Sequence, residues 1–124
     1  MIQGGTPTIY VSDMERAVTF YTRTLGLKLL EREDDDWASI DAGDGLVLGL
    51  QPANGNGDRA AGSGSMSIGF NVTQPLEEVV DKLKHRGVSF RGPIQGKEQA
   101  PVRFAFFGDP DGNALYLCEL AEME

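Results

Sequence analysis

The sequence predicts an α+β fold in which one β-α-β-β-β module is written twice, within a single domain that covers residues 1–124. The modules span approximately residues 5–51 and 65–120. Three features predict this arrangement: short stretches in which apolar and polar residues alternate, two stretches with apolar residues at helical spacing, and a fixed distance between matching positions of the two halves. A chain of this length has room for one modest hydrophobic core.

The first module begins with a strand at residues 6–11, where the side chains alternate in character. Ser12 and Asp13 supply oxygens that cap the helix that follows, and this helix has one apolar stripe. The stripe consists of Met14, Ala17, Val18, Tyr21 and Leu25. Gly26 ends the helix because glycine readily adopts the left-handed conformation found there. Three strands are predicted to follow, at residues 27–31, 37–41 and 46–51.

The second module repeats this plan after a polar, glycine-rich linker at residues 52–65, which we expect to be mobile. A strand is predicted at residues 66–72, and Pro75 suits the first turn of the next helix. The apolar stripe of that helix consists of Leu76, Val79, Val80 and Leu83. Gly87 ends the helix, and three strands are predicted at residues 88–90, 102–107 and 114–119.

Matching positions are separated by two constant distances. Early in the modules the distance is 61 residues, as between Val11 and Val72. Later it is 67 residues, as between Asp44 and Asp111. The six additional residues fall in the loop around residues 92–100. Two constant distances indicate an internal duplication.

Two motifs resemble the vicinal oxygen chelate superfamily, which includes glyoxalases, bleomycin resistance proteins and extradiol dioxygenases. The run Val-Ser-Asp-Met-Glu-Arg-Ala-Val-Thr-Phe-Tyr at residues 11–21, followed by Leu25-Gly26, resembles the family's first strand and helix. Asp-Pro-Asp-Gly-Asn at residues 109–113 resembles the hairpin before the family's last strand, where proline pre-sets a turn. The resemblance implies that the modules form a curled, open-barrel-like mixed sheet around a cavity.

In that family a divalent metal occupies the cavity, and its ligands come from four equivalent positions that are histidine or glutamate in many members. From the two motifs and the two distances, the equivalent positions in this sequence are Thr6, Gly49, Ser67 and Tyr116. A catalytic metal generally needs about three imidazole, thiolate or carboxylate donors, and none of these four residues supplies one. The only histidine, His85, falls on the second predicted helix. The resemblance therefore implies a member without the metal ligands, with no metal and no cofactor.

Residues that share a strand face with these positions are predicted to line the cavity. The predicted ligand-binding residues are Thr6, Thr8, Tyr10, Trp37, Ser39, Gly49, Gln51, Ser67, Asn71, Phe104, Phe106, Tyr116 and Cys118. Aromatic rings with a few placed polar groups are typical of a small-molecule site, but aromatic residues on strands also favour a packed core. Both alternatives stay open from the sequence. Arg103 is expected to be exposed because it alternates away from this face, and Cys118 is expected to be a passive thiol.

Charge and composition exclude several classes of partner. The net charge of −8 disfavours nucleic acid, and the basic cluster at residues 82–86 lies at a predicted helix end, where it complements the helix dipole. No apolar run approaches the roughly 20 residues that span a bilayer, and no secretory signal is evident. With one cysteine there is no internal disulfide. These features predict a cytoplasmic protein without a membrane partner.

The favoured hypothesis is a metal-independent protein that binds a drug or an aromatic metabolite, like the family's bleomycin resistance proteins, which confer antibiotic resistance. The resemblance implies a homodimer, and the acidic net charge suits a cationic ligand. One alternative is a metal-dependent glyoxalase-like lyase, epimerase or dioxygenase whose ligands lie elsewhere in the chain. Another alternative is an interaction module with a closed cavity. Enzymatic activity therefore stays open, and the sequence assigns no catalytic residue.

Overall fold

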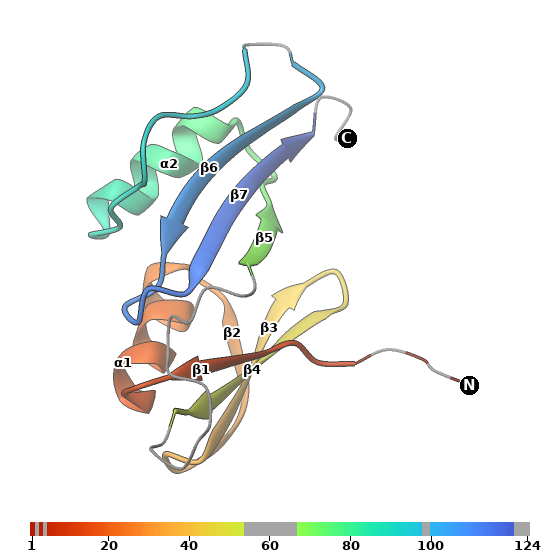
Figure 1. Ribbon diagram of the computed structural model, residues 1–124, viewed down its shortest axis with the longest axis vertical. Helices are drawn as coiled ribbons and strands as arrows, with labels where there is room; N and C mark the ends of the chain where they lie inside the picture. Colours follow the sequence, from red (N-terminus) through yellow and green to blue (C-terminus); the bar gives the residue numbers. More distant parts are fainter. Residues whose placement is uncertain (2, 4, 54–66, 98–99, 121–124) are drawn as a thin grey trace. The chain divides into compact units, whose positions relative to one another are not determined.

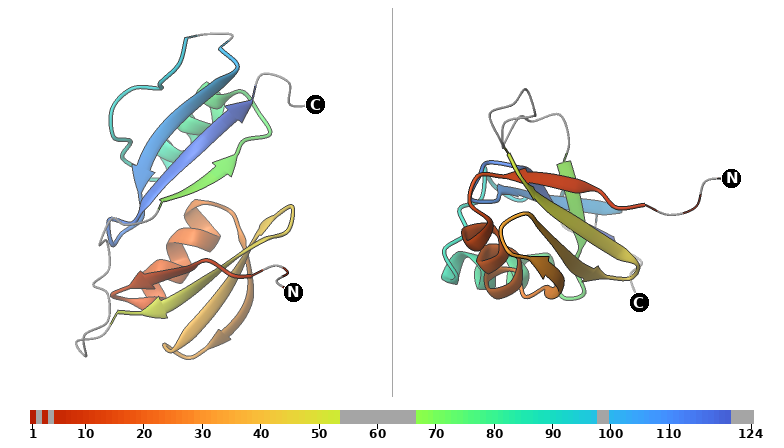
Figure 2. Two further views of the ribbon diagram at one scale, coloured as in Figure 1. Left: turned by 45° about the vertical axis from the view of Figure 1, so that its right-hand side comes forward. Right: turned by 90° about the horizontal axis from the view of Figure 1, so that it is seen from below.

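The structure is a computed structural model that describes residues 1, 3, 5–53, 67–97 and 100–120 (Figure 1). The chain divides into two compact units, Met1–Ser63 and Gly64–Glu124. Each unit consists of one mixed sheet with helical segments against one of its faces (Figure 2). This arrangement confirms the predicted α+β class. Most of the predicted linker, residues 54–65, lies outside the described residues.

The first unit contains a four-stranded sheet in the order β1-β4-β3-β2. Strand β1 is parallel to β4, whereas the other two pairings are antiparallel. The elements are β1 (Thr8–Val11), α1 (Met14–Thr19), a π-helical turn η1 (Phe20–Thr24), β2 (Lys28–Glu33), β3 (Trp37–Gly43) and β4 (Leu46–Pro52).

The first helix begins where the sequence predicts and ends differently. An Asp13 carboxylate oxygen accepts a hydrogen bond from the backbone N–H of Arg16 at 3.0 Å, which caps α1. The predicted single helix then becomes π-helical, with the N–H of Leu25 donating to the carbonyl of Phe20 at 3.0 Å. The Thr22 hydroxyl donates to the Val18 carbonyl at 2.7 Å and so competes for an acceptor of the α-helical ladder.

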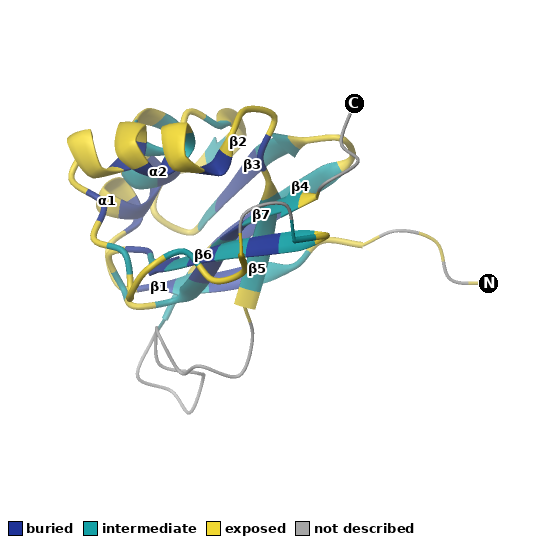
Figure 3. Ribbon diagram, turned by 90° about the horizontal axis from the view of Figure 1, so that it is seen from above, coloured by how far each residue is buried: buried dark blue, intermediate teal, exposed yellow. Residues whose placement is uncertain are grey.

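The second unit contains a three-stranded sheet in the order β5-β7-β6. Its elements are β5 (Ser67–Asn71), α2 (Leu76–His85), β6 (Val102–Gly108) and β7 (Ala114–Leu120). Strand β5 is parallel to β7, and β6 is antiparallel to β7. Helix α2 contacts β6 and β7, with one buried side and one exposed side (Figure 3). None of the helices in the described part of the chain is long and apolar enough to cross a membrane.

Two local predictions in the second unit are wrong. Residues 88–90 do not form a strand, because only an isolated bridge joins Phe90 to Phe107 and Gly92-Pro93 soon interrupts the pairing. Pro75 does not lie in the first helical turn but precedes it as the N-cap residue. Because proline offers no capping side chain, a Glu119 carboxylate oxygen on β7 accepts from the N–H of Leu76 at 2.8 Å instead.

The two sheets have the same pairing register. Thr8 pairs with Gly49 in the first sheet, and the positions 61 and 67 residues later, Gly69 and Tyr116, pair in the second. Gly49 also pairs with Ser39, and Tyr116 pairs with the equivalent Phe106. The internal distances read from the sequence therefore relate equivalent pairs in the two sheets.

Candidate functional site

The sheet of the second unit has one face under α2 and a second face that is rich in aromatic rings. Arg103, Ala105 and Phe107 are buried on the α2 side of β6, whereas Phe104 and Phe106 alternate to the other side and are half-buried. We call this second surface the aromatic face. Its members are Ser67, Gly69 and Asn71 on β5, Ala114, Tyr116 and Cys118 on β7, and Phe104, Phe106 and Gly108 on β6.

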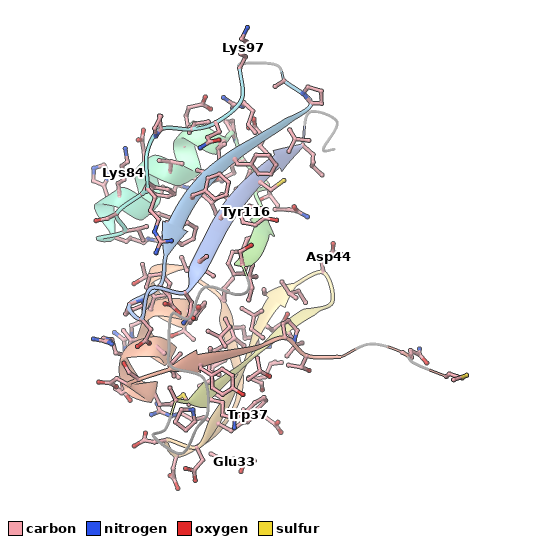
Figure 4. All side chains as sticks on the ribbon, viewed as in Figure 1. Glu33, Trp37, Asp44, Lys84, Lys97 and Tyr116 are labelled. Carbon is pink, nitrogen blue, oxygen red and sulfur yellow. The ribbon has the colours of Figure 1, made fainter. Side chains whose placement is uncertain are left out.

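Three rings of the aromatic face form one cluster. The ring centroid of Tyr116 lies 5.7 Å from that of Phe104 and 5.6 Å from that of Phe106, and the two phenylalanine centroids are 6.0 Å apart. These separations are typical of favourable aromatic pairs. The Tyr116 ring, which Figure 4 labels, also lies over Gly69, where the Cβ of any larger residue would overlap the ring. Glycine at position 69 therefore allows Tyr116 to lie flat against the sheet.

The first unit has the corresponding face, opposite α1. Trp37, Thr8 and Tyr10 are half-buried there. The Trp37 ring lies over Gly49 as the Tyr116 ring lies over Gly69. The remaining predicted site residues of this unit differ in exposure. Ser39 is buried, whereas Gln51 and Thr6 are exposed, with Thr6 just before β1.

Two polar residues at the edge of the aromatic face were missed in the sequence. The backbone N–H of Arg91 donates to the Phe106 carbonyl at 2.7 Å, and Gln95 forms an isolated antiparallel bridge with Phe104. Residues directly opposite in an antiparallel pair share a face, so both side chains belong with the aromatic rings. The sequence predicted only a strand at residues 88–90, just before this segment. It gave no indication that the segment lies beside β6.

The expectation that Arg103 is exposed is wrong. Its exposed fraction is 8%, and its guanidinium donates to Glu77 at 2.7 and 3.0 Å and to Glu119 at 2.7 Å. The hydrogen bonds that Arg103 donates, first to Glu77 and then to Glu119, raise its pKa above the ordinary value. The same contact with Arg103 lowers the pKa of Glu77 to about 2. A buried arginine needs such partners, and they come from α2 and β7, which strand alternation cannot reveal.

The four positions that hold a metal in the resembling family do not fit a divalent ion. Thr6 and Ser67 have neutral hydroxyls, Gly49 has no side chain, and Tyr116 is a weak ligand. Across the described ranges, no group of three or more histidine, cysteine or carboxylate side chains is placed to hold an ion. Asp109 instead accepts from the backbone of Asp111 and Asn113 and stabilises the hairpin.

Two further residues could take part in chemistry, His85 on α2 and Cys118 on the aromatic face. His85 lies on α2 with its Nδ1 2.8 Å from the Asp81 carbonyl. Cys118 is a half-buried free thiol on β7. Among the described residues, neither has a partner that would make it a nucleophile or a base, so the chemistry offered by the second sheet is an aromatic surface with polar edges.

Known proteins share this architecture and sequence pattern. The chain is 29% identical over 114 residues to glyoxalase domain-containing protein 4 of Rattus norvegicus, a match that covers 87% of the chain and 38% of that protein. The chain thus spans well under half the length of the curated relatives it matches.

Solved structures extend the likeness over the whole chain. A superfamily member from Sphaerobacter thermophilus DSM 20745 is 26% identical with a TM-score of 0.78, and the match covers 96% of this chain and 98% of that one. TnmS3, an antibiotic binding protein from Streptomyces sp. CB03234, is 25% identical with a TM-score of 0.76, with 97% of both chains covered. The sequence profile of the Glyoxalase/Bleomycin resistance protein/Dioxygenase superfamily matches residues 5–117. The resemblance seen in the two motifs is thereby confirmed, and the chain belongs to this superfamily.

Proposed function

We propose that this protein binds a small, flat aromatic molecule, a drug or a metabolite, on its aromatic face. The observation that carries the proposal is the cluster of three half-buried rings, Phe104, Phe106 and Tyr116, on the side of the sheet opposite α2. Membership of a superfamily that includes resistance proteins supports it, as does the likeness to TnmS3, an antibiotic binding protein.

The physical basis is stacking against a surface that is already built. Each aromatic pair with a flat ligand contributes about 0.5–1.5 kcal/mol beyond the burial of apolar area. Polar side chains at the margin, Ser67 and Asn71 on β5 and Gln95 beside β6, can orient the ligand through hydrogen bonds. The sequence also predicts that Trp37 and Tyr10 of the first unit contact the ligand, and this stays a prediction.

We also propose that binding is independent of metal. The support is the chemistry of Thr6, Gly49, Ser67 and Tyr116, which lack the imidazole and carboxylate donors of a catalytic site. The homodimer and the cytoplasmic location expected from the sequence stay predictions. Light scattering that gives the 13.4 kDa mass of one chain would contradict the dimer.

A panel of planar aromatic compounds tests the binding proposal through thermal shift. A ligand present at about 100 times its dissociation constant should stabilise the folded protein by about 2.7 kcal/mol. In the variant Phe106→Leu, which loses a ring and keeps an apolar side chain, the dissociation constant should rise about fivefold, as expected for one stacking contact.

Phe90→Leu is the matched control, because the Phe90 ring packs 5.3 Å from that of Phe107, on the buried side of β6. This control should lower the stability and leave the affinity unchanged. If no compound in a broad panel stabilises the protein, the binding proposal is wrong and the interaction module becomes the better hypothesis.

A further inference from the structure

Arg91 reaches the aromatic face from the segment that runs beside β6. An antiparallel bridge places Phe90 opposite Phe107, and their rings pack on the α2 side with centroids 5.3 Å apart. The next residue, Arg91, lies opposite Phe106 and donates its N–H to the Phe106 carbonyl at 2.7 Å. Because side chains alternate along an extended segment, the Arg91 side chain points to the side that Phe106 occupies.

Gly108 gives an independent indication of where the guanidinium lies. Gly108 is two residues beyond Phe106 on β6 and pairs with Ala114, so its missing side chain would also belong to the aromatic face. A Cβ atom at this position would overlap Nη2 of Arg91. The guanidinium therefore occupies the space above Gly108, at the end of the ring cluster.

The positive charge of Arg91 is not paired with a carboxylate of the described residues. Its side chain has one acceptor there, the Gly112 carbonyl at a long distance of 3.5 Å. By contrast, Arg103 and Arg32 each pair with two carboxylates. A guanidinium carries five N–H donors in a planar fork, so most of the donors of Arg91 are available to a ligand. The residue is also exposed, which leaves it accessible.

We propose that Arg91 binds an anionic group of the ligand, and that the ligand class is a planar aryl carboxylate. This proposal rests on the binding function proposed above for the aromatic face. The rings would stack on the aryl group while the guanidinium fork takes up the carboxylate through paired hydrogen bonds. The net charge of −8 favours a cation at long range, but salt screens that field beyond about 8 Å, so the local arginine determines which charge is preferred.

Two probes of nearly equal shape, 2-naphthoate and the neutral 2-naphthamide, test the proposal by titration calorimetry. The wild-type protein should bind 2-naphthoate about five- to tenfold more tightly than 2-naphthamide, the effect of an exposed charge-assisted contact. Arg91→Gln should remove this preference by weakening the binding of 2-naphthoate much more than that of 2-naphthamide. Arg91→Lys should retain part of the preference, because it keeps the charge and loses the planar fork.

Lys84→Gln is the matched control, since it removes one positive charge from the exposed side of α2 (Figure 4). Its preference for 2-naphthoate should equal that of the wild type. Equal binding of the two probes to the wild type, or a preference that persists in Arg91→Gln, would overturn the role of Arg91 and leave the aromatic binding surface standing. Failure of both probes to bind would count against the binding function and this proposal together.

Discussion

Both sheets of this protein place an aromatic ring over a glycine, but the two rings come from positions that are not equivalent. Trp37 on β3 lies over Gly49, whereas Tyr116 on β7 lies over Gly69. By the 67-residue distance, the counterpart of Tyr116 is Gly49 itself, and the counterpart of Trp37 is Phe104. Each sheet therefore has a ring packed over a glycine, but the ring comes from β3 in the first unit and from β7 in the second.

The variant Gly49→Ala tests this close approach. An alanine Cβ would overlap the Trp37 ring, so the ring must move. We expect a loss of about 1–3 kcal/mol in the free energy of unfolding, as for other overpacked sites. Because Trp37 is the only tryptophan, its emission should shift in the same variant. Urea unfolding and fluorescence spectra measure the two effects.

A double-mutant cycle provides the control for this prediction. In a Trp37→Leu background the ring is absent, so Gly49→Ala should cost much less than in the wild type. An equal cost in both backgrounds would show that the alanine disturbs the β4 backbone and not the ring.

At the scale of elements, the sequence predicted the strands and helices better than their partners. Seven of the eight predicted strands form, with shifted ends, because alternation and glycine stops report local structure. The segment at residues 88–90 does not form a strand, because Gly92-Pro93, just beyond it, interrupts its pairing with β6. Arg103 was misjudged for a similar reason, since its exposure depends on Glu77 and Glu119, which are distant in sequence.

The link between α2 and the sheet predicts a pH-dependent stability. Arg103 lowers the pKa of Glu77 from its ordinary 4.5 to about 2. A carboxyl whose pKa is lowered in the folded state stabilises the protein above its unfolded pKa, and this contribution is lost as the pH falls toward about 2. The Glu77 side chain is 55% exposed, so solvent screens the pair, and we expect Glu77→Gln to cost only about 1 kcal/mol at pH 7.

Urea unfolding of the wild type and Glu77→Gln across the acid range measures this contribution. The difference in unfolding free energy should stay constant above about pH 5 and vanish near pH 2. Glu78→Gln removes a charge from the next, exposed position and should change stability by less than about 0.5 kcal/mol. A difference for Glu77→Gln that persists at pH 2 would show that the ion pair is not its source.

For the whole molecule, the duplication relates the pairing of one sheet to that of the other, and it also explains what the sequence could not predict about the site. The pairs Thr8–Gly49 and Gly69–Tyr116 are related by the two constant distances, although the distances alone do not say which residues pair. Gln95 lies within the six-residue excess of the second module, so no counterpart in the first module could indicate its place beside Phe104. Arg91 has Leu30 as its counterpart, an exposed residue at a bulge of β2, so the repeat gave no indication of a charge there.

Metal content is the property of the whole molecule that separates the proposed binding function from metal-dependent chemistry. A member of this superfamily whose four positions are Thr6, Gly49, Ser67 and Tyr116 should contain well under one ion per chain when it is purified without chelators. Addition of Zn²⁺, Ni²⁺ or Mn²⁺ should leave the melting temperature unchanged. A bound ion would raise it, since an ion present at about 100 times its dissociation constant would stabilise the protein by about 2.7 kcal/mol. Elemental analysis and thermal unfolding measure both. One tightly held Zn²⁺, Ni²⁺, Mn²⁺ or iron per chain would instead favour a lyase, epimerase or dioxygenase whose ligands lie outside these four positions.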